Sequence, residues 1–256
     1  MTRLLKARLR DREVLCGTIL SLNSPEVADL LAGIGFDWLF LDAEHGAIEP
    51  HDVLLLLHAI ADRTPVLVRI PNLDEGWVKR ALDAGADGVI VPQVGTADQA
   101  ESAVRWAHYP PNGTRGLGTA RTNRYGFELA DSLRMAEDRV MVVVQAETAE
   151  AVENIETISR VRGIDAVFVG PYDLSASLGH PGEVEHPKVR AAILRIAGAC
   201  RDVGIPTGIF AMNPSGLAAW VDQGFTLLAA GVDAGFLGSA AADALSALRA
   251  GAARPG

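Results

Sequence analysis

The chain has 256 residues, 49% of them hydrophobic, and a formal net charge of −9. This length can bury a large core as one α/β barrel or as two small domains. No Ser/Pro-rich linker or change of composition divides the chain, so we expect one domain over residues 1–256. The acidic balance argues against a nucleic-acid partner, because phosphate binding needs a clustered excess of lysine and arginine.

The N-terminal segment 3-RLLKARLRDRE-13 predicts an amphipathic first helix, and no apolar segment of a secretory signal follows it. No apolar run approaches the roughly 18 residues that a membrane span needs. Cys16 and Cys200 have no spacing typical of a disulfide framework or a metal site, so we expect reduced, buried thiols. The sequence predicts a cytoplasmic protein with no membrane partner.

Eight short apolar runs predict strands, and segments with helical spacing of apolar residues lie between them. The runs are nearly apolar throughout, which is typical of a parallel sheet covered by helices on both faces. Eight such units predict a single α/β domain with the (β/α)₈ fold, a TIM barrel. An open doubly wound sheet is the alternative, but no GxGxxG follows the first strand. The predicted strands are 15–20, 38–43, 65–70, 88–93, 140–147, 166–173, 206–211 and 226–233, and the predicted helices include 25–35, 75–85, 97–107, 149–159 and 187–204.

Polar side chains follow most of these strands at their carboxyl ends. In a barrel of this kind the carboxyl ends share one rim, where reactive residues lie. We therefore expect one site at this rim, built from Asp42, Glu44, His45, Arg69, Gln93, Gln145, Glu147 and Asp173.

Two of these residues, Glu147 and Asp173, end neighbouring predicted strands. Two adjacent carboxylates repel each other unless a cation lies between them. Oxygen ligands with open positions suit Mg²⁺, Mn²⁺ or Co²⁺ better than a closed zinc site. The alternative is that both are solvated loop acids.

Arg69 follows the buried run 65-PVLV-68, and a buried guanidinium needs an anion. That anion is either a substrate carboxylate, as in a keto acid, or Asp42 or Glu44, and both can hold at once. His45 is the histidine at a strand's carboxyl end, and imidazole suits proton transfer near neutral pH. With Asp42 three positions before it, His45 is the predicted base and Asp42 its orienting partner.

The lysines bear on the mechanism. Of 23 basic residues only Lys6, Lys79 and Lys188 are lysines, and all three fall in predicted helices outside the barrel. An aldolase that forms an imine needs a lysine in the pocket. If the reaction forms an enolate, a metal ion must therefore serve as the electron sink.

These features resemble the HpcH/HpaI aldolase family, the metal-dependent class II pyruvate aldolases. The resemblance runs from about Gly17 to about Gly238. The motifs that carry it are 42-DAEHG-46, 68-VRIP-71, 113-GTRG-116, 145-QAET-148 and 163-GIDAVFVGPYDLSASLG-179. It implies reversible cleavage of a 4-hydroxy-2-oxo acid, through a metal-stabilised enolate, to pyruvate or a related 2-oxo acid and an aldehyde.

The resemblance also implies residue roles. Glu147 and Asp173 hold the divalent cation, Arg69 steadies the enolate oxygen, and His45, oriented by Asp42, moves the proton through a water molecule. Substrate contacts and support are assigned to Gln145, to the backbone of Gly170, Pro171 and Tyr172, and to Glu44, which supports Arg69 or metal-bound water.

The family usually forms a homohexamer with exchanged C-terminal helices, so we expect 239-SAAADALSALRAG-251 to cover a neighbouring subunit. The chain departs from the family pattern at Tyr172, where a smaller residue is usual, and at Ala146, where a larger aliphatic residue is common. These departures concern the size of the substrate rather than the chemistry.

Other functions remain open. A 2-oxo acid decarboxylase or an acyl-CoA lyase would use the same scaffold and enolate. A phosphosugar-binding barrel would use 231-GVDAGFLG-238 to hold phosphate. A barrel that binds a partner without catalysis would have lost Glu147, Asp173, His45 or Arg69, and all four are present.

Overall fold

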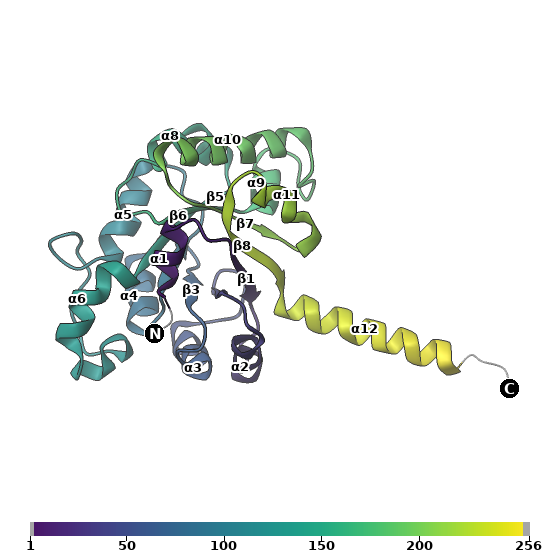
Figure 1. The fold of residues 1–256 in the computed structure, drawn as a ribbon, viewed down its shortest axis with the longest axis horizontal. Helices are drawn as coiled ribbons and strands as arrows, with labels where there is room; N and C mark the ends of the chain where they lie inside the picture. The colour runs from purple at the N-terminus through teal and green to yellow at the C-terminus, as the bar shows by residue number, and fades with distance from the viewer. Residues whose placement is uncertain (1–2, 253–256) are drawn as a thin grey trace.

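Eight parallel strands form a closed barrel in the computed structural model of the chain, which describes residues 3–252 (Figure 1). Each strand pairs with the next in sequence, and β8 pairs with β1 to close the sheet. The predicted (β/α)₈ barrel is therefore confirmed, and an open doubly wound sheet is excluded. The strands are β1 (Leu15–Leu20), β2 (Trp38–Asp42), β3 (Val66–Arg69), β4 (Gly88–Val91), β5 (Met141–Ala146), β6 (Ala166–Val169), β7 (Thr207–Ala211) and β8 (Phe225–Val232).

Helices surround the barrel, and several begin at a polar residue that caps the first turn. The side chains of Ser24, Asp74, Thr96 and Thr148 each accept a hydrogen bond from the backbone N–H three residues later. The helices are α1 (Leu5–Arg10), α2 (Pro25–Ile34), α3 (Pro50–Ile60), α4 (Glu75–Asp83), α5 (Ala97–Ala107), α6 (Leu129–Arg139), α7 (Ala149–Glu153), α8 (Ile155–Ile158), α9 (Pro171–Ser177), α10 (Pro187–Val203), α11 (Ala218–Val221) and α12 (Asp233–Ala252), with 3₁₀ turns η1 (Arg121–Gly126) and η2 (Pro214–Gly216).

Two local predictions need correction. The predicted helix 149–159 is two short helices, α7 and α8, which meet at Asn154. Cys200 is buried as expected, but Cys16 is exposed. Its neighbour Leu15 fills the barrel interior, and because side chains alternate along a strand, Cys16 points outward.

Alternate residues of each strand divide the core into two layers. One set fills the barrel interior and includes Trp38, Phe40 and Phe168, whose rings make edge and tilted contacts 5.7–6.2 Å apart between centroids. The other set packs under the surrounding helices. The same alternation makes Asp42, Arg69 and Gln145 the next inward-facing residues above the aromatic layer.

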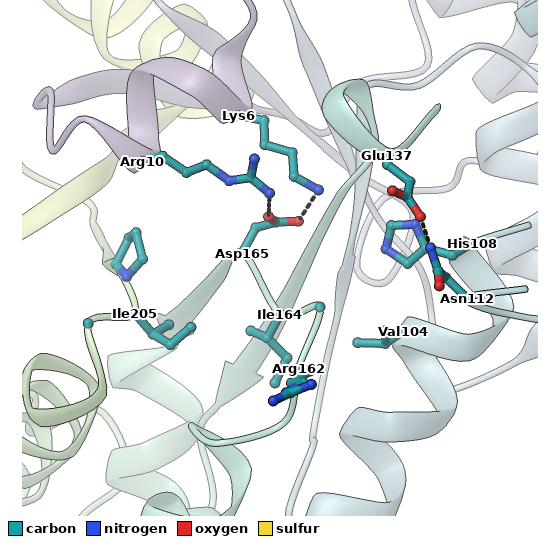
Figure 2. Close-up of a pocket in the computed structure, with 13 residues that line it drawn as sticks. Lys6, Arg10, Val104, His108, Asn112, Glu137, Arg162, Ile164, Asp165 and Ile205 are labelled. Carbon is teal, nitrogen blue, oxygen red and sulfur yellow. Dashed lines mark hydrogen bonds and ion pairs between the residues drawn. The ribbon is translucent and has the colours of Figure 1, made fainter. Parts of the chain in front are cut away.

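Helix α1 closes the amino-terminal end of the barrel. Leu5 and Leu9 join the interior core. Lys6 is buried between them, where its Nζ donates to the carbonyl of Val140 at 2.7 Å and lies 3.1 Å from Asp165 Oδ2 (Figure 2). A cavity of about 530 Å³ opens beside this pair.

Helix α12 leaves the barrel as a long arm (Figure 1). Its apolar side chains Phe236, Leu237, Leu245 and Leu248 are exposed. Among the helices of residues 3–252, none combines the length and the apolar character needed to cross a membrane.

Candidate active site at the carboxyl ends of the strands

Arg69 lies at the centre of the barrel mouth, held by two carboxylates. The register of β2 and β3 sets Asp42 opposite Arg69. Arg69 donates from Nε and Nη2 to the two oxygens of Asp42 at 2.9 and 2.7 Å, and its Nη1 lies 3.1 Å from Glu44 Oε2. The guanidinium is 5.0 Å from the ring centroid of Phe40. Arg69 is therefore paired with both of the carboxylates that the sequence offered as alternative partners, and Glu44 contacts it directly.

Asp42 also fixes the turn that carries His45. Its Oδ1 accepts the backbone N–H groups of Glu44 at 3.0 Å and His45 at 3.3 Å. The His45 side chain is 64% exposed, and its Nε2 lies 3.9 Å from Glu44 Oε2. Asp42 therefore orients the backbone of His45, whereas the ring faces Glu44. A side chain at Gly46 would collide with the carbonyl of Asp42, which explains the glycine after the histidine.

Glu147 is a buried carboxylate with two neutral hydrogen-bond donors. It is 1% exposed. Its oxygens accept from the backbone N–H of Gln93 at 2.8 Å and from Nε2 of Gln145 at 2.6 Å. Burial raises its pKa to about 7, and the charges of Asp173 and Glu44 add to the rise, while the Gln93 hydrogen bond and Arg69 oppose it.

Asp173 lies in the first turn of α9, just beyond the end of β6, and its side chain is exposed. Gly170 is the N-terminal cap residue, and a Cβ there would collide with Glu147 Oε2. This close approach brings the start of α9 against the Glu147 carboxylate. Pro171 has no N–H to donate, so it shapes the turn, and the ring of Tyr172 lies 6.3 Å from that of Phe210.

These residues fit a divalent cation. Burial raises the pKa of Glu44, and the charges of Asp42 and Asp173 raise it further, against Arg69 and His45. The mouth thus collects the carboxylates of Asp42, Glu44, Glu147 and Asp173 around one arginine. Gln145 Oε1 is also buried without a hydrogen-bond partner among the described residues. Oxygen donors with excess negative charge suit Mg²⁺ or Mn²⁺.

One contact at this site was not anticipated from the sequence. Gln93 was expected to contribute its side chain, but its backbone N–H is what binds Glu147. Gln93 has a φ of 54°, which is uncommon for a residue other than glycine. No sequence pattern marks such a residue, so the contact could not be predicted.

A buried carboxylate of the protein itself lies at the start of α12. The buried carboxylate of Asp233 accepts the backbone N–H groups of Ser21, Leu22 and Ala234 at 2.8–3.1 Å and the Ser21 hydroxyl at 2.7 Å. The negative charge of Asp233 would repel a phosphate bound at 231-GVDAGFLG-238, and its hydrogen bonds already use the N–H of Ala234. The phosphosugar-binding alternative is therefore disfavoured.

Comparison with known proteins identifies the family. The model of the HpcH/HpaI aldolase/citrate lyase family matches residues 16–240. The chain belongs to this family. The matched range contains every residue of the barrel mouth described above.

Relatives within the HpcH/HpaI family match the chain over nearly its whole length. A 4-hydroxy-2-oxo-heptane-1,7-dioate aldolase of Escherichia coli is 40% identical over 257 residues, covering 98% of this chain and 97% of the relative. A hydroxypyruvate/pyruvate aldolase of Paraburkholderia phytofirmans is 39% identical over 256 residues, covering 97% and 98%. The crystal structure of a family protein from Burkholderia cenocepacia J2315 has a TM-score of 0.92 at 40% identity, covering 96% of this chain and 98% of that one.

Proposed function

We propose that this HpcH/HpaI family member is a class II, divalent-metal-dependent aldolase, a carbon–carbon lyase. Its reaction is the reversible cleavage of 4-hydroxy-2-oxo acids to pyruvate, or a related 2-oxo acid, and an aldehyde. The observation that carries the proposal is the buried Glu147 carboxylate, whose pKa is raised by burial and by the charges of Asp173 and Glu44. The names of the E. coli and P. phytofirmans relatives support the substrate class.

In this proposal Glu147 and Asp173 hold Mg²⁺, Mn²⁺ or Co²⁺. The cation supplies a positive charge that binds the 2-oxo acid and draws electron density from its keto group. Gln145 holds Glu147 Oε2 in place from inside the barrel, and Gln93 holds the other oxygen. Both carboxylate oxygens are thus positioned before substrate arrives, which lowers the cost of reorganisation.

Arg69 stabilises the negative oxygen that develops when the carbon–carbon bond breaks. A guanidinium has five N–H donors, and three of them face Asp42 and Glu44, which leaves two for substrate. Preorganised donors of this kind contribute several kcal/mol to barrier reduction, about 3–4 kcal/mol in well-studied cases. The two carboxylates prevent the guanidinium from turning away.

His45 moves the proton of the aldol hydroxyl group through a water molecule. Its exposed ring lies at the rim beside Glu44, so water reaches it without opening the site. Asp42 fixes the turn below it. The backbone of Gly170 and Tyr172, shaped by Pro171, and the Gln145 amide line the substrate side of the pocket.

The proposal extends to assembly and location. The exposed apolar residues of α12, including Phe236, Leu237 and Leu248, need a partner surface, which supports a homohexamer with exchanged C-terminal helices. The chain without α12 then forms the barrel domain. We assign the protein to the cytoplasm, where thiols such as Cys16 and Cys200 stay reduced.

The test compares Asp173→Asn with Asp98→Asn, another exposed acid in the first turn of a helix, α5. Pyruvate release is measured for a panel of 4-hydroxy-2-oxo acids, after chelation and re-addition of Mg²⁺, Mn²⁺ or Co²⁺. We expect Asp173→Asn to lose metal-dependent turnover with its circular dichroism unchanged, and Asp98→Asn to match wild type. Full turnover in chelator-treated Asp173→Asn protein would contradict the ligand assignment.

The same assay separates the alternatives. Pyruvate release from a coenzyme A thioester, but not from the corresponding free acid, indicates an acyl-CoA lyase. Release of carbon dioxide from oxaloacetate, without cleavage of any 4-hydroxy-2-oxo acid, indicates a decarboxylase. The proposed aldolase needs no coenzyme A and yields one aldehyde for each pyruvate.

A further inference from the structure

The loop between α9 and α10, residues 178–186, gathers three metal-ligating side chains outside the barrel mouth. His180, Glu183 and His186 each offer one ligand atom, and these atoms lie within 4.8 Å of one another. The rings of His180 and His186 stack with their centroids 3.5 Å apart. The neighbouring acid Glu185 is already paired with Arg190 at 2.6 Å, whereas Glu183 forms no ion pair among residues 3–252.

Backbone hydrogen bonds within the loop bring these three side chains together. The N–H of Glu183 donates to the carbonyl of His180 at 3.0 Å, and the N–H of His186 donates to the carbonyl of Glu183 at 2.9 Å. The chain thus makes two successive turns of three residues. Side chains three positions apart in such turns lie over one another. The spacing His-x-x-Glu-x-x-His therefore places all three on one side of the loop.

The loop is anchored to a buried residue of α9. The N–H of His180 donates to the carbonyl of Ser175 at 2.8 Å, and the N–H of Gly182 donates to its hydroxyl at 2.9 Å. Ser175 is fully buried. Gly179 and Gly182 adopt φ values of 83° and 81°, which let the loop turn back on itself. A ligand that binds this loop therefore has little backbone left to order.

We propose that His180, Glu183 and His186 form a second metal site, specific for Zn²⁺ or a similar ion such as Ni²⁺ or Co²⁺. Two imidazoles and one carboxylate match the ligands that zinc takes when a fourth position stays open to water. Mg²⁺ prefers oxygen ligands throughout, so it belongs at the mouth and not here. The mouth thus favours Mg²⁺ or Mn²⁺ and the loop favours Zn²⁺ or Ni²⁺, whereas Co²⁺ suits both ligand sets.

Binding requires small movements of the two half-buried histidine rings. Zinc–nitrogen bonds are about 2.0–2.1 Å long, so the stacked rings must turn apart to face one ion. Nδ1 of His186 accepts a long hydrogen bond, 3.3 Å, from the N–H of Lys188. Coordination through Nε2 keeps this bond and coordination through Nδ1 breaks it, but Lys188 is exposed in the first turn of α10, where water can accept from a released N–H.

An ion at this loop would also act on a neighbouring cavity. Val184 and Glu185, between the proposed ligands, line a cavity of about 240 Å³ together with Tyr172 and Phe210. The ion would restrict the motion of Val184 and Glu185, which form one side of this cavity beside the rim of the mouth. The proposal itself does not depend on the reaction proposed above.

The test measures Zn²⁺ binding by calorimetry to chelator-treated full-length protein that carries Glu147→Gln, so that the mouth site is disabled. His180→Ala with His186→Ala is compared with His51→Ala with His58→Ala. The control pair is exposed on α3 and seven residues apart, about 10 Å along the helix, too far to share an ion. We expect one zinc equivalent in the Glu147→Gln protein and in the control, and at least about tenfold weaker binding without His180 and His186.

A further variant guards against an effect of misfolding. Glu183→Gln alters one exposed residue and should also weaken zinc binding, with wild-type circular dichroism. The proposal is wrong if the Glu147→Gln protein binds no zinc at micromolar concentration. It is equally wrong if removal of both histidines, or of the Glu183 charge, leaves the affinity unchanged.

Discussion

The two ends of the barrel differ in how their buried charges are paired. At the amino-terminal end, Lys6 contacts the carboxylate of Asp165. At the carboxyl-terminal end, Arg69 contacts the carboxylates of Asp42 and Glu44, and a further carboxylate, Glu147, has only neutral hydrogen-bond donors. Asp165 accepts from the N–H of Val142 at 3.0 Å, contacts Lys6 at 3.1 Å and lies 3.7 Å from Arg10 (Figure 2). Asp165 there has two cationic partners, Lys6 and Arg10. At the mouth, Asp42 and Glu44 pair with Arg69, and the carboxylates of Glu147 and Asp173 add further negative charge nearby.

This difference distinguishes a structural ion pair from a binding site. The ion pairs of Lys6 and Arg10 with Asp165 anchor α1, and the cavity beside them is larger than the one beside Tyr172. Excess negative charge at the mouth is destabilising unless a cation lies between the carboxylates. The buried amine of Lys6 lies at the end of the barrel opposite the site, so it cannot form an imine with a substrate bound there. Lys79 and Lys188 are exposed on outer helices.

The largest expected effect breaks the amino-terminal pair. Lys6→Met leaves Asp165 buried with one partner fewer, and we expect the free energy of unfolding to fall by about 3–5 kcal/mol. Turnover per folded molecule should not change, because the mouth is untouched. Urea denaturation and pyruvate release check both statements. Adding Asp165→Asn should recover part of the stability, and a loss of turnover in folded Lys6→Met would remove the distinction between the two ends.

The next effect falls on turnover at the mouth. Arg69→Lys keeps the charge but loses the two parallel hydrogen bonds to Asp42, so we expect kcat to fall about 10²–10³-fold. Arg115→Lys is the matched control, because Arg115 is equally buried, pairs with Asp83 at 2.8 Å and stacks on Tyr109 away from the mouth. Similar losses of kcat in both variants would mean that Arg69 acts through stability alone.

Much of this contrast follows from the sequence, and the rest depends on contacts that only the fold creates. Asp42, Arg69 and Glu147 were predicted at one rim because each follows an apolar run, and parallel strands end together. The pairing of Asp42 with Arg69 needs a particular register, and the raised pKa of Glu147 needs its burial. The pattern of apolar residues predicts neither the register of β2 with β3 nor the burial of Glu147.

Other features had weaker signals. Helix α6 and turn η1 lie between β4 and β5, where η1 has few apolar residues and α6 buries none, so periodicity did not reveal them. The grouping of His180 and His186 depends on two consecutive three-residue turns. Sequence spacing alone does not distinguish such turns from an extended loop.

A smaller effect concerns the excess charge itself. The pKa of Glu147 is about 7, against an ordinary 4.5. The folded chain therefore binds more protons than the unfolded chain between these values, and the free energy of unfolding falls as pH rises from about 4.5 to 7. At about 1.4 kcal/mol per pH unit, Glu147→Gln should stabilise chelator-treated protein by up to about 3 kcal/mol above pH 7, and by little near pH 4.

In Glu147→Gln, the new side-chain amide can replace the Glu147 carboxylate without a clash with the neighbouring amide of Gln145. Gln145 Oε1 has no partner among the described residues, so a flip of the Gln145 amide lets it accept from the new amide group. Thermal melts from pH 4 to pH 8 in chelator provide the measurement. Saturating Mg²⁺ or Mn²⁺ should reverse the order and favour the wild type. A variant no more stable than wild type at pH 8 would show that the mouth holds no excess charge.

The smallest effect concerns the exposed rim above the charged floor of the mouth. Tyr172 is 41% exposed, and its ring lies 6.3 Å from that of Phe210. Removing this aromatic contact with Tyr172→Ala costs about 1 kcal/mol and opens the rim. We expect kcat/KM to rise for bulky aldehydes relative to small ones in the condensation direction, with little change in kcat for pyruvate release. Phe127→Ala, which removes a 94% exposed ring, is the control and should change neither the kcat/KM for bulky relative to small aldehydes nor the kcat for pyruvate release. If Tyr172→Ala lowers the rate for every aldehyde by the same factor, the rim does not select by size, and the tyrosine only supports the turn at the start of α9.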